Sequence, residues 1–198
     1  MRRLAAALGH IRSELDRLQL SWALVGGLAI AAYIDPRTTR DVDVVIAIDG
    51  DAQAEDLART LEARGYQFKE DGVLEHRDTG RMMALRLIAP GRLGDLVLVD
   101  LMFASSGIEP EIAGSAEAME IFPGIPVPVA RKGHLIALKV LASRPQDEVD
   151  AKALLATVTA SDLDLARRSL VLIDRRGYHR DKDLSGLLET WFAEVRRD

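Results

Sequence analysis

Two aspartates, Asp41 and Asp43, stand two positions apart in the otherwise apolar stretch "DVDVVIAI". This alternation predicts a β-strand, because successive side chains of a strand point to opposite faces. Val42 and Val44 then face the core, and the two carboxylates project together from the other face. Carboxylates are costly to bury without a partner, so the pair indicates a site for a hard cation such as Mg²⁺. The alternative is a strand whose acidic face is solvated.

A glycine pair, Gly26 and Gly27, separates the expected strand "SWALV" from the expected helix "LAIAAYI", which Pro36 closes. Small residues at such a turn let backbone N–H groups approach a phosphate at the start of the helix. Any tight turn from strand to helix also favours glycine. The pair is therefore a candidate phosphate-binding turn, and its alternative is an ordinary structural turn.

A third acid, Asp100, interrupts the apolar strand in "DLVLVDLMFA". Three carboxylates on neighbouring strands suit a two-metal phosphoryl-transfer site. A single acid near the end of a strand is also common without any catalytic role. Both interpretations of Asp100 stay open at this point.

The chain mixes strands and helices in its first two thirds and is helical in its last third. A helix over 51–64, with Asp51 as its N-cap and Gly65 as its C′ residue, follows the strand of Asp41 and Asp43. The stretches "VLEHR", "MMALRLIA" and "DLVLVDLMFA" predict three meandering strands, and "IPVPVA" a further extended piece. The other helices are expected at 2–19, 131–143, 147–158, 162–175 and 183–197. This layout divides the chain into an α/β domain, 1–130, and a helical domain, 131–198.

The 198 residues include no cysteine, which excludes disulfides, thiolate metal sites and cysteine nucleophiles. The net charge of −5 argues against a generally basic nucleic-acid-binding surface, but not against a local basic cleft for phosphates. No apolar run is long enough for a membrane span. Near the N-terminus, charged residues interrupt the apolar stretch too early for a signal peptide. We therefore expect a cytoplasmic protein with no membrane partner.

The order of strand, Gly26-Gly27, helix and Asp-hydrophobic-Asp-hydrophobic resembles the signature of the DNA polymerase β-type nucleotidyltransferase superfamily. The stretches "RTTRDVDVVI", "LVDLMF", "HLIALKVLA" and "RPQDEVDAKAL" are similar, in that order, to the AbiEii/MenA-like nucleotidyltransferase toxins. The resemblance covers roughly residues 20–158. It implies an α/β (α+β) nucleotidyltransferase fold, with a mixed, mostly antiparallel sheet flanked by helices and a C-terminal helical bundle.

The resemblance also implies roles for the singled-out residues. Gly26 and Gly27 would hold the phosphates of a nucleoside triphosphate (NTP). Asp41 and Asp43 would bind Mg²⁺, with two ions expected at the site. Asp100 would complete the acidic set and help to activate the attacking hydroxyl. The reaction would be in-line attack on the α-phosphate with release of pyrophosphate.

Cations must neutralise the part of the triphosphate that metals do not. Lys139 lies in the apolar helix "HLIALKVLA", where a lysine either extends its ammonium group to solvent or points into a cleft. The family resemblance places a phosphate-contacting lysine on this helix. Arg40 is a second candidate for the phosphates, although it is equally consistent with a solvated loop charge.

Asp147 and Asp150 follow Pro145 at the start of a helix, where acids also favour the helix dipole. Gln146 stands where the family carries a lysine, which weakens the case for a catalytic role of this segment. Asp150 remains a candidate site residue that would orient Lys139 or contact the base or ribose.

The basic side chains of the last third favour RNA slightly, with a solvated helix face as the alternative; they are Arg167, Arg168, Arg175, Arg176, Arg180 and Lys182. The histidines show no metal-binding spacing and are expected to be surface or capping residues; they are His10, His76, His134 and His179.

The sequence thus predicts a Mg²⁺-dependent nucleotidyltransferase that moves an NMP from an NTP to a hydroxyl of tRNA or of a protein. In the AbiEii/MenA-like setting it would act as a toxin with a cognate antitoxin. One alternative is an antibiotic nucleotidyltransferase for aminoglycosides or lincosamides. Another is a catalytically silent nucleotide-binding module, against which the three acids argue, because their repulsion costs stability without metal.

Overall fold

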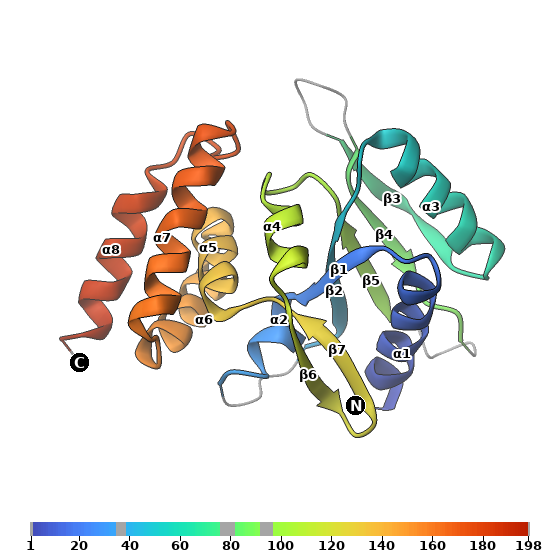
Figure 1. The fold of residues 1–198 in the computed structure, drawn as a ribbon, viewed down its shortest axis with the longest axis horizontal. Helices are drawn as coiled ribbons and strands as arrows, with labels where there is room; N and C mark the ends of the chain where they lie inside the picture. Colours follow the sequence, from blue (N-terminus) through green and yellow to red (C-terminus); the bar gives the residue numbers. More distant parts are fainter. Residues whose placement is uncertain (1, 35–38, 76–81, 92–96, 198) are drawn as a thin grey trace.

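A computed structural model of the chain describes residues 2–34, 39–75, 82–91 and 97–197 (Figure 1). Its helices are α1 (Arg2–Arg17), α2 (Gly26–Ile30), α3 (Asp51–Ala63), α4 (Glu109–Gly114), α5 (Lys132–Ala142), α6 (Pro145–Ala156), α7 (Ala160–Arg175) and α8 (Leu184–Val195). Its strands are β1 (Ser21–Val25), β2 (Asp41–Ala47), β3 (Gln67–Glu75), β4 (Met82–Ile88), β5 (Leu98–Met102), β6 (Glu117–Phe122) and β7 (Ile125–Val129).

The strands that the structure describes form one sheet in the order β3-β4-β5-β2-β1-β7-β6. β2 pairs in parallel with β5, and β1 with β7, while the other neighbouring strands are antiparallel. The predicted mixed, mostly antiparallel sheet is therefore confirmed. The meander of β3, β4 and β5 is confirmed as well, although residues 76–81 and 92–96, between these strands, lie outside the described residues.

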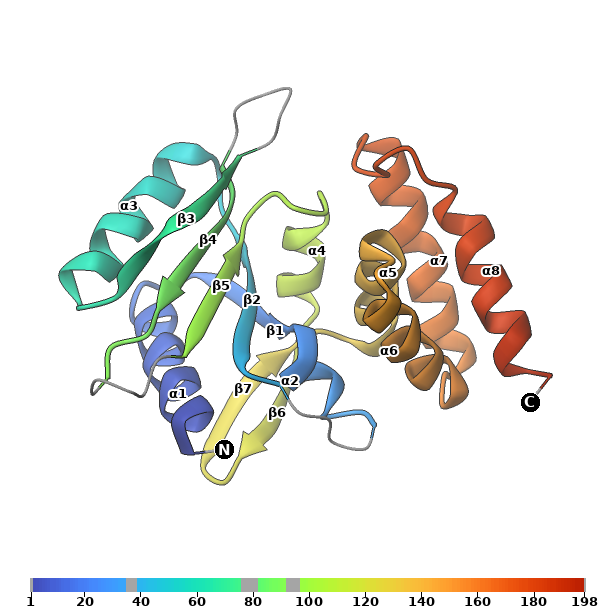
Figure 2. The ribbon, with the colours of Figure 1, turned by 180° about the vertical axis from the view of Figure 1, so that it is seen from behind.

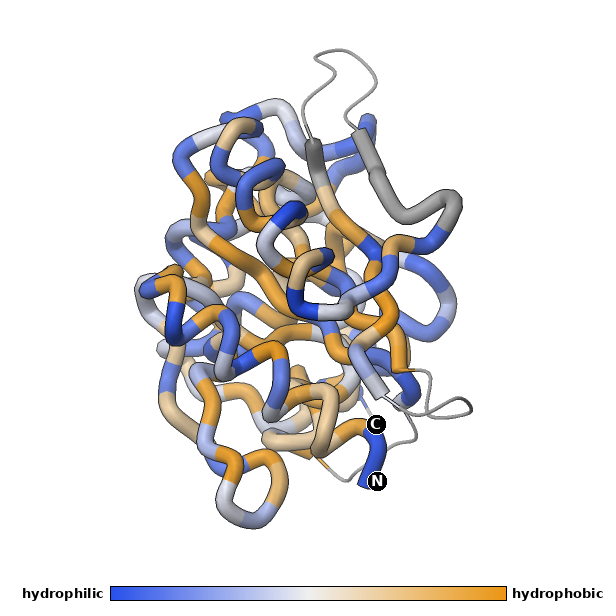
Figure 3. Tube along the Cα trace, turned by 90° about the vertical axis from the view of Figure 1, so that its right-hand side faces the viewer, coloured by the Kyte–Doolittle hydropathy of each residue, from blue (hydrophilic) through white to orange (hydrophobic). Residues whose placement is uncertain are grey.

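Helices cover both faces of the sheet. Figure 1 shows α1 and α3 on one side and α4 with the C-terminal helices on the other, and the view from behind agrees (Figure 2). α1 is amphipathic as expected: Leu8, Ile11 and Leu15 recur at helical spacing and are fully buried. Hydrophobic segments accordingly run through the middle of the molecule, and hydrophilic ones gather in outer turns (Figure 3). Within the described ranges, no helix is both long and apolar enough to cross a membrane.

The sheet register places the acids on neighbouring strands. In the parallel pair of β2 and β5, Asp43 lies directly opposite Asp100. Directly paired residues project from the same face of a sheet. The burial of β2 also alternates as predicted, since Val42 and Val44 are fully buried while Asp41 and Asp43 are only partly so.

Two local predictions differ from the structure. Asp51 is the first residue of α3 rather than its N-cap, because the preceding Gly50, with φ of 151°, takes the non-helical cap position. α2 starts at Gly26 itself, two residues before the predicted start. Gly65 does follow α3 with a left-handed φ of 90°, which confirms it as the residue after the helix.

The sequence did not indicate α4 or β6. α4 is only 6 residues long and contains a proline, and half of the residues of β6 are exposed, so neither carries a clear apolar period. β3 begins at Gln67, earlier than predicted, because a register shift lies between Phe68 and Val73.

The change from strands to helices falls between Val129 and Lys132, and the predicted C-terminal helices are confirmed to within a few residues. A division into separate folding domains, 1–130 and 131–198, stays a prediction. His134 is buried rather than at the surface, because α5 is enclosed by neighbouring helices, among them α7. His10 is exposed and His179 is half-exposed, as predicted, whereas His76 lies outside the described residues.

Candidate active site

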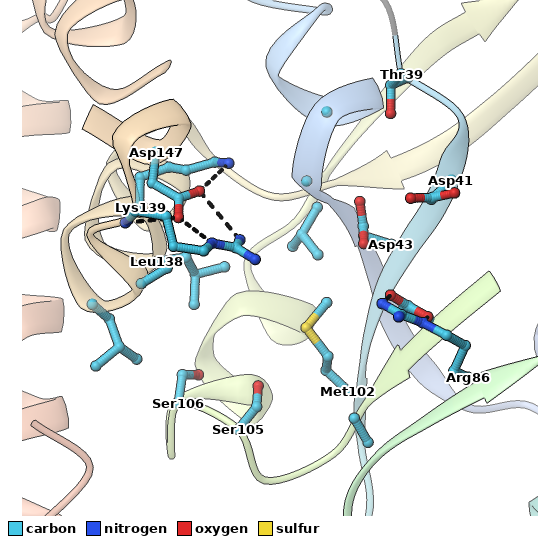
Figure 4. Close-up of a pocket in the computed structure, with 18 of the residues that line it drawn as sticks. Thr39, Asp41, Asp43, Arg86, Met102, Ser105, Ser106, Leu138, Lys139 and Asp147 are labelled. Atoms are coloured by element: carbon cyan, nitrogen blue, oxygen red, sulfur yellow. Dashed lines mark hydrogen bonds and ion pairs between the residues drawn. The ribbon is translucent and has the colours of Figure 1, made fainter. Parts of the chain in front are cut away.

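A cleft of about 690 Å³ lies between the sheet and the C-terminal helices. Its walls come from the turn between β1 and α2, from β2, β4 and β5, and from α5, the start of α6 and the loop between α7 and α8. Every site residue predicted from the sequence except Asp150 lines this cleft, namely Gly26, Gly27, Arg40, Asp41, Asp43, Asp100 and Lys139. Figure 4 shows Asp41 and Asp43 on the strand side, and Lys139 and Asp147 on the helical side.

Asp43 is the most perturbed acid of the cleft. Burial, followed by the negative charges of Asp100 and Asp41, raises its pKa to about 6, although Lys139 and the backbone amide of Gly27 act in the opposite direction. The acids therefore repel one another in the absence of a cation. This is the electrostatic setting in which a divalent metal ion is bound favourably.

The Gly26-Gly27 turn lies directly against this acid. Gly26 has a left-handed φ of 62°, and a Cβ built on it would lie 1.9 Å from Asp43 Oδ2. The backbone N–H of Gly27 donates a hydrogen bond to the Asp43 carboxylate. Glycine is thus required both for the backbone conformation and for the close approach of the turn to the acid.

Asp100 does not face the cleft alone. Arg86 of β4, which lies directly opposite Asp100 in the sheet, donates from Nε to Oδ1 at 2.8 Å and from Nη2 to Oδ2 at 2.6 Å. These hydrogen bonds raise the pKa of Arg86. Sequence reasoning missed Arg86, although a single charge in the apolar strand "MMALRLIA" is the same signal that identified Asp100.

Lys139 points into the cleft and is held by two acids of α6. Its Nζ lies 2.7 Å from Asp147 Oδ1 and 2.8 Å from Asp150 Oδ2, and both acidic side chains are 2% exposed. Arg144 Nε contacts Asp147 at 2.6 Å, and Gln146 donates to Asp150 at 3.0 Å. Burial raises the pKa of Asp147, but the hydrogen bonds from Arg144 and Lys139 outweigh burial and hold that pKa below its usual value. Asp150 therefore lies where it orients Lys139.

The loop after β5 supplies a polar floor that the sequence did not indicate. Ser105 and Ser106 line the cleft, and each donates its backbone N–H and its hydroxyl to Oε1 of the buried Glu109. Arg180, from the loop between α7 and α8, also lines the cleft and donates to the carbonyl of Ser105 at 3.0 Å. Lys182 of the same loop donates to the last carbonyls of α5, those of Leu141 and Ala142.

Most other basic residues of the last third are engaged within the protein. Arg167 pairs with Glu189, Arg176 with Glu111 and Arg168 with Asp164. These pairs join exposed side chains, and the choice between an RNA-binding face and a solvated helix face stays a prediction. Arg40 is exposed at the rim of the cleft, where either interpretation of its role stays possible.

The acids fit Mg²⁺ as a pair rather than as a preformed set. Across the described part of the chain, no three acidic or histidine side chains are already grouped as metal ligands. Asp41 and Asp43 nevertheless project from one face of β2, and burial together with the charges of Asp100 and Asp41 raises the pKa of Asp43. Mg²⁺ commonly takes one or two carboxylates and completes its shell with water and substrate phosphates.

A mixed sheet with a glycine turn beside a strand that carries two acids is the arrangement expected of a nucleotidyltransferase. A sequence model described as "Nucleotidyl transferase AbiEii toxin, Type IV TA system" matches residues 12–196, so the chain belongs to this family of nucleotidyltransferases. An NTP is the substrate that membership in this family implies. Among curated proteins, no sequence matches the chain significantly.

Solved structures share the fold at low identity. An antigenic nucleotidyltransferase-like protein from Paracoccidioides brasiliensis is 19% identical with a TM-score of 0.52, over 96% of this chain and 93% of that one. The lincosamide antibiotic adenylyltransferase LnuA, bound to lincomycin, is 13% identical with a TM-score of 0.51, over 78% of this chain and 97% of that one. These likenesses confirm the predicted fold class.

Proposed function

We propose that this protein is a Mg²⁺-dependent toxin that transfers an NMP from an NTP to a hydroxyl group of tRNA or of a protein. The observation that carries the proposal is the cleft itself, in which Asp41 and Asp43 on β2 face Lys139 on α5. Family membership supports the reaction class, and the type IV toxin–antitoxin setting supports a cognate antitoxin.

In this reaction the acceptor oxygen forms a bond to the α-phosphorus, and the bond from that phosphorus to the bridging oxygen of the β-phosphate breaks. Pyrophosphate leaves, and the acceptor hydroxyl loses its proton. Mg²⁺ held by Asp41 and Asp43 would supply positive charge that neutralises the triphosphate. Positioning and charge neutralisation account for most of the catalysis in such transfers.

The chain's own cations neutralise the remaining phosphate charge. An ammonium group has three N–H donors, and Lys139 gives two of them to Asp147 and Asp150, so the third is available to a phosphate oxygen. The backbone turn at Gly26-Gly27 and the rim residue Arg40 contact the same phosphates. Asp150 acts through Lys139 as a positioning residue.

The decisive experiment incubates the protein with each α-³²P-labelled NTP, Mg²⁺ and, in separate reactions, total tRNA or protein alone. We expect label to enter RNA or protein, and Asp41→Asn and Asp43→Asn to abolish it while circular dichroism shows a retained fold. Equal labelling by these variants would contradict the proposal.

The same assay separates the other acceptors. Lincosamide and aminoglycoside antibiotics are added in parallel reactions, and label that enters only an antibiotic would replace the tRNA or protein acceptor by a small molecule. Mg²⁺-dependent NTP binding without any transfer would instead favour a silent nucleotide-binding module.

A further inference from the structure

The third acid of the cleft is already neutralised by a side chain of this protein. Arg86, Asp100 and Asp43 form one row across β4, β5 and β2, in which each residue lies directly opposite the next. Their side chains therefore share the face that lines the cleft. Arg86 thus lies on the same face of the sheet as the acids, with its side chain 44% exposed.

Both oxygens of Asp100 are used in this pair. Nε and Nη2 of Arg86 donate to Oδ1 and Oδ2 at 2.8 and 2.6 Å, the planar bidentate geometry in which a guanidinium binds a carboxylate most strongly. The Asp100 side chain is 17% exposed, so water screens the pair only partly. A metal ion at Asp100 would have to compete with both charge-assisted hydrogen bonds and would lie beside the positive guanidinium.

Asp41, Asp43 and Asp100 together carry three negative charges on the strand side of the cleft. Arg86 supplies one positive charge to this group, and a single divalent ion would supply the other two. Asp100 differs from Asp41 and Asp43, because both of its carboxylate oxygens accept hydrogen bonds from Arg86.

We propose that Arg86 takes the place of a second metal ion at Asp100, so that this enzyme works with one Mg²⁺, bound by Asp41 and Asp43. The inference rests on the proposed nucleotidyl transfer at this cleft. It assigns Arg86 as a positioning residue, which holds Asp100 as a structural anion and presents a fixed positive charge beside the metal ion.

The test counts Mn²⁺ ions bound per chain by electron paramagnetic resonance, with Mn²⁺ alone as the probe at pH 8. We expect one ion for the wild type and two for Arg86→Met, whose side chain has similar length and no charge. Arg86→Lys should stay at one ion, because it retains the positive charge. The double variant Arg86→Met/Asp100→Asn should also return to one ion, because the second site then lacks its ligand.

Arg40→Met is the matched control, since it removes the same charge from the rim of the cleft without exposing Asp100. It should keep one ion. Two ions in the wild type, one ion in Arg86→Met, or a second ion in Arg40→Met would each overturn the inference. Failure of the proposed function would give a different result. The wild type would then bind no Mn²⁺, or Asp41→Asn would bind as many Mn²⁺ ions as the wild type.

Discussion

At the scale of single residues, Gly26 lies so close to the Asp43 carboxylate that there is no room for a side chain at position 26. A methyl group at Gly26 would meet Asp43 Oδ2 at 1.9 Å, on a backbone with φ of 62°. We expect Gly26→Ala to displace Asp43, to abolish nucleotidyl transfer and to lower the free energy of unfolding by more than about 1 kcal/mol, the usual cost of a left-handed alanine. Urea denaturation and the labelling assay check both effects.

Gly124→Ala is the control for this prediction, because Gly124 has a similar φ of 74° with no atom within 4 Å of a built Cβ. It shares the backbone strain without the contact and should retain activity. Equal activity and equal free energies of unfolding in the two alanine variants would show that the contact with Asp43 does not matter for function.

Asp43 predicts an unusual dependence of stability on pH. Its folded pKa of about 6 lies above the ordinary value of 3.8, so its contribution to stability is present below pH 3.8 and is lost as the pH rises through 6. In EDTA at pH 8 we therefore expect the free energy of unfolding of Asp43→Asn to be about 1–3 kcal/mol higher than that of the wild type. At pH 4 the two proteins should be similar.

Addition of Mg²⁺ at pH 8 should stabilise the wild type and not Asp43→Asn, because the metal requires the carboxylate. Urea titrations with EDTA or Mg²⁺ measure both effects. Asp49→Asn, at an exposed aspartate, should show neither. A variant less stable than the wild type in EDTA at pH 8 would show that the acids do not repel one another.

Sequence reasoning located single residues where an apolar period is interrupted by charge. Asp41, Asp43 and Asp100 were found in this way, and the structure brings them to one cleft. Arg86 carries the same signal, yet its partner is 14 positions away on another strand, and the register that joins them is set by tertiary pairing. A pairing of this kind is not encoded in the spacing of either residue.

At the scale of elements, α5 and α6 are joined by a buried ionic cluster. Lys139 of α5 is 12% exposed and its partner Asp147 of α6 is 2% exposed. Asp147→Ala leaves Lys139 with less compensation and should lower the free energy of unfolding by about 3 kcal/mol, as removal of one partner from a buried pair usually does. Urea denaturation at pH 7.5 measures this loss.

The control is Glu189→Gln, which removes the partner of Arg167 between α7 and α8, where both side chains are about half-exposed. An exposed pair contributes at most about 1 kcal/mol. Similar losses in the two variants would mean that the cluster between α5 and α6 is effectively solvated.

His134 of α5 predicts acid sensitivity of the helical part. Burial, followed by the positive charge of Arg131, lowers its pKa to about 4, with Arg168 adding to the shift and Glu111 opposing it. Because the folded pKa lies below the ordinary 6.5, the stability it contributes is present above pH 6.5 and lost as the pH falls toward 4. From pH 8 to pH 5 this loss is about 2 kcal/mol.

His134→Gln cannot take up the proton and should lose less stability over the same pH range. The comparison of wild type and variant by urea denaturation isolates this residue from the carboxylates, which titrate in both proteins. Parallel curves for the two proteins would refute the prediction.

At the scale of the whole molecule, the cleft requires both parts of the chain. Gly26 and the acids come from the part of the chain that contains the sheet, whereas Lys139, Arg144 and Arg180 come from the C-terminal helices and the loops that join them. Binding of Mg²⁺ with the preferred NTP should therefore slow amide hydrogen exchange in both the β1–α2 turn and α5. The hairpin of β6 and β7, which supplies no cleft residue, serves as the internal control. Protection confined to the sheet would assign nucleotide binding to the first part alone.

The general architecture was predictable because long periodic segments determine it. The helices of the last third and the strand of Asp41 and Asp43 have clear periods, and the structure confirms them. The short α4 and the exposed β6 have none, since their conformations are fixed by neighbours in the sheet rather than by local pattern. The hydrogen bond from Arg180 to the carbonyl of Ser105 was equally unpredictable, because the two residues lie 75 positions apart in the chain.

Lys182 donates to the carbonyls of Leu141 and Ala142 at 2.9 and 3.1 Å, so the end of α5 is completed by a residue about forty positions later in the chain. A ribosome adds residues in order, and protein segments begin to fold as they emerge. The acidic strands are therefore available early in synthesis, whereas the helix that presents Lys139 gains its C-terminal support only after residue 182 has emerged. For a toxin, this order of synthesis delays a finished cleft until most of the chain has been made, and a prematurely terminated chain is left without it.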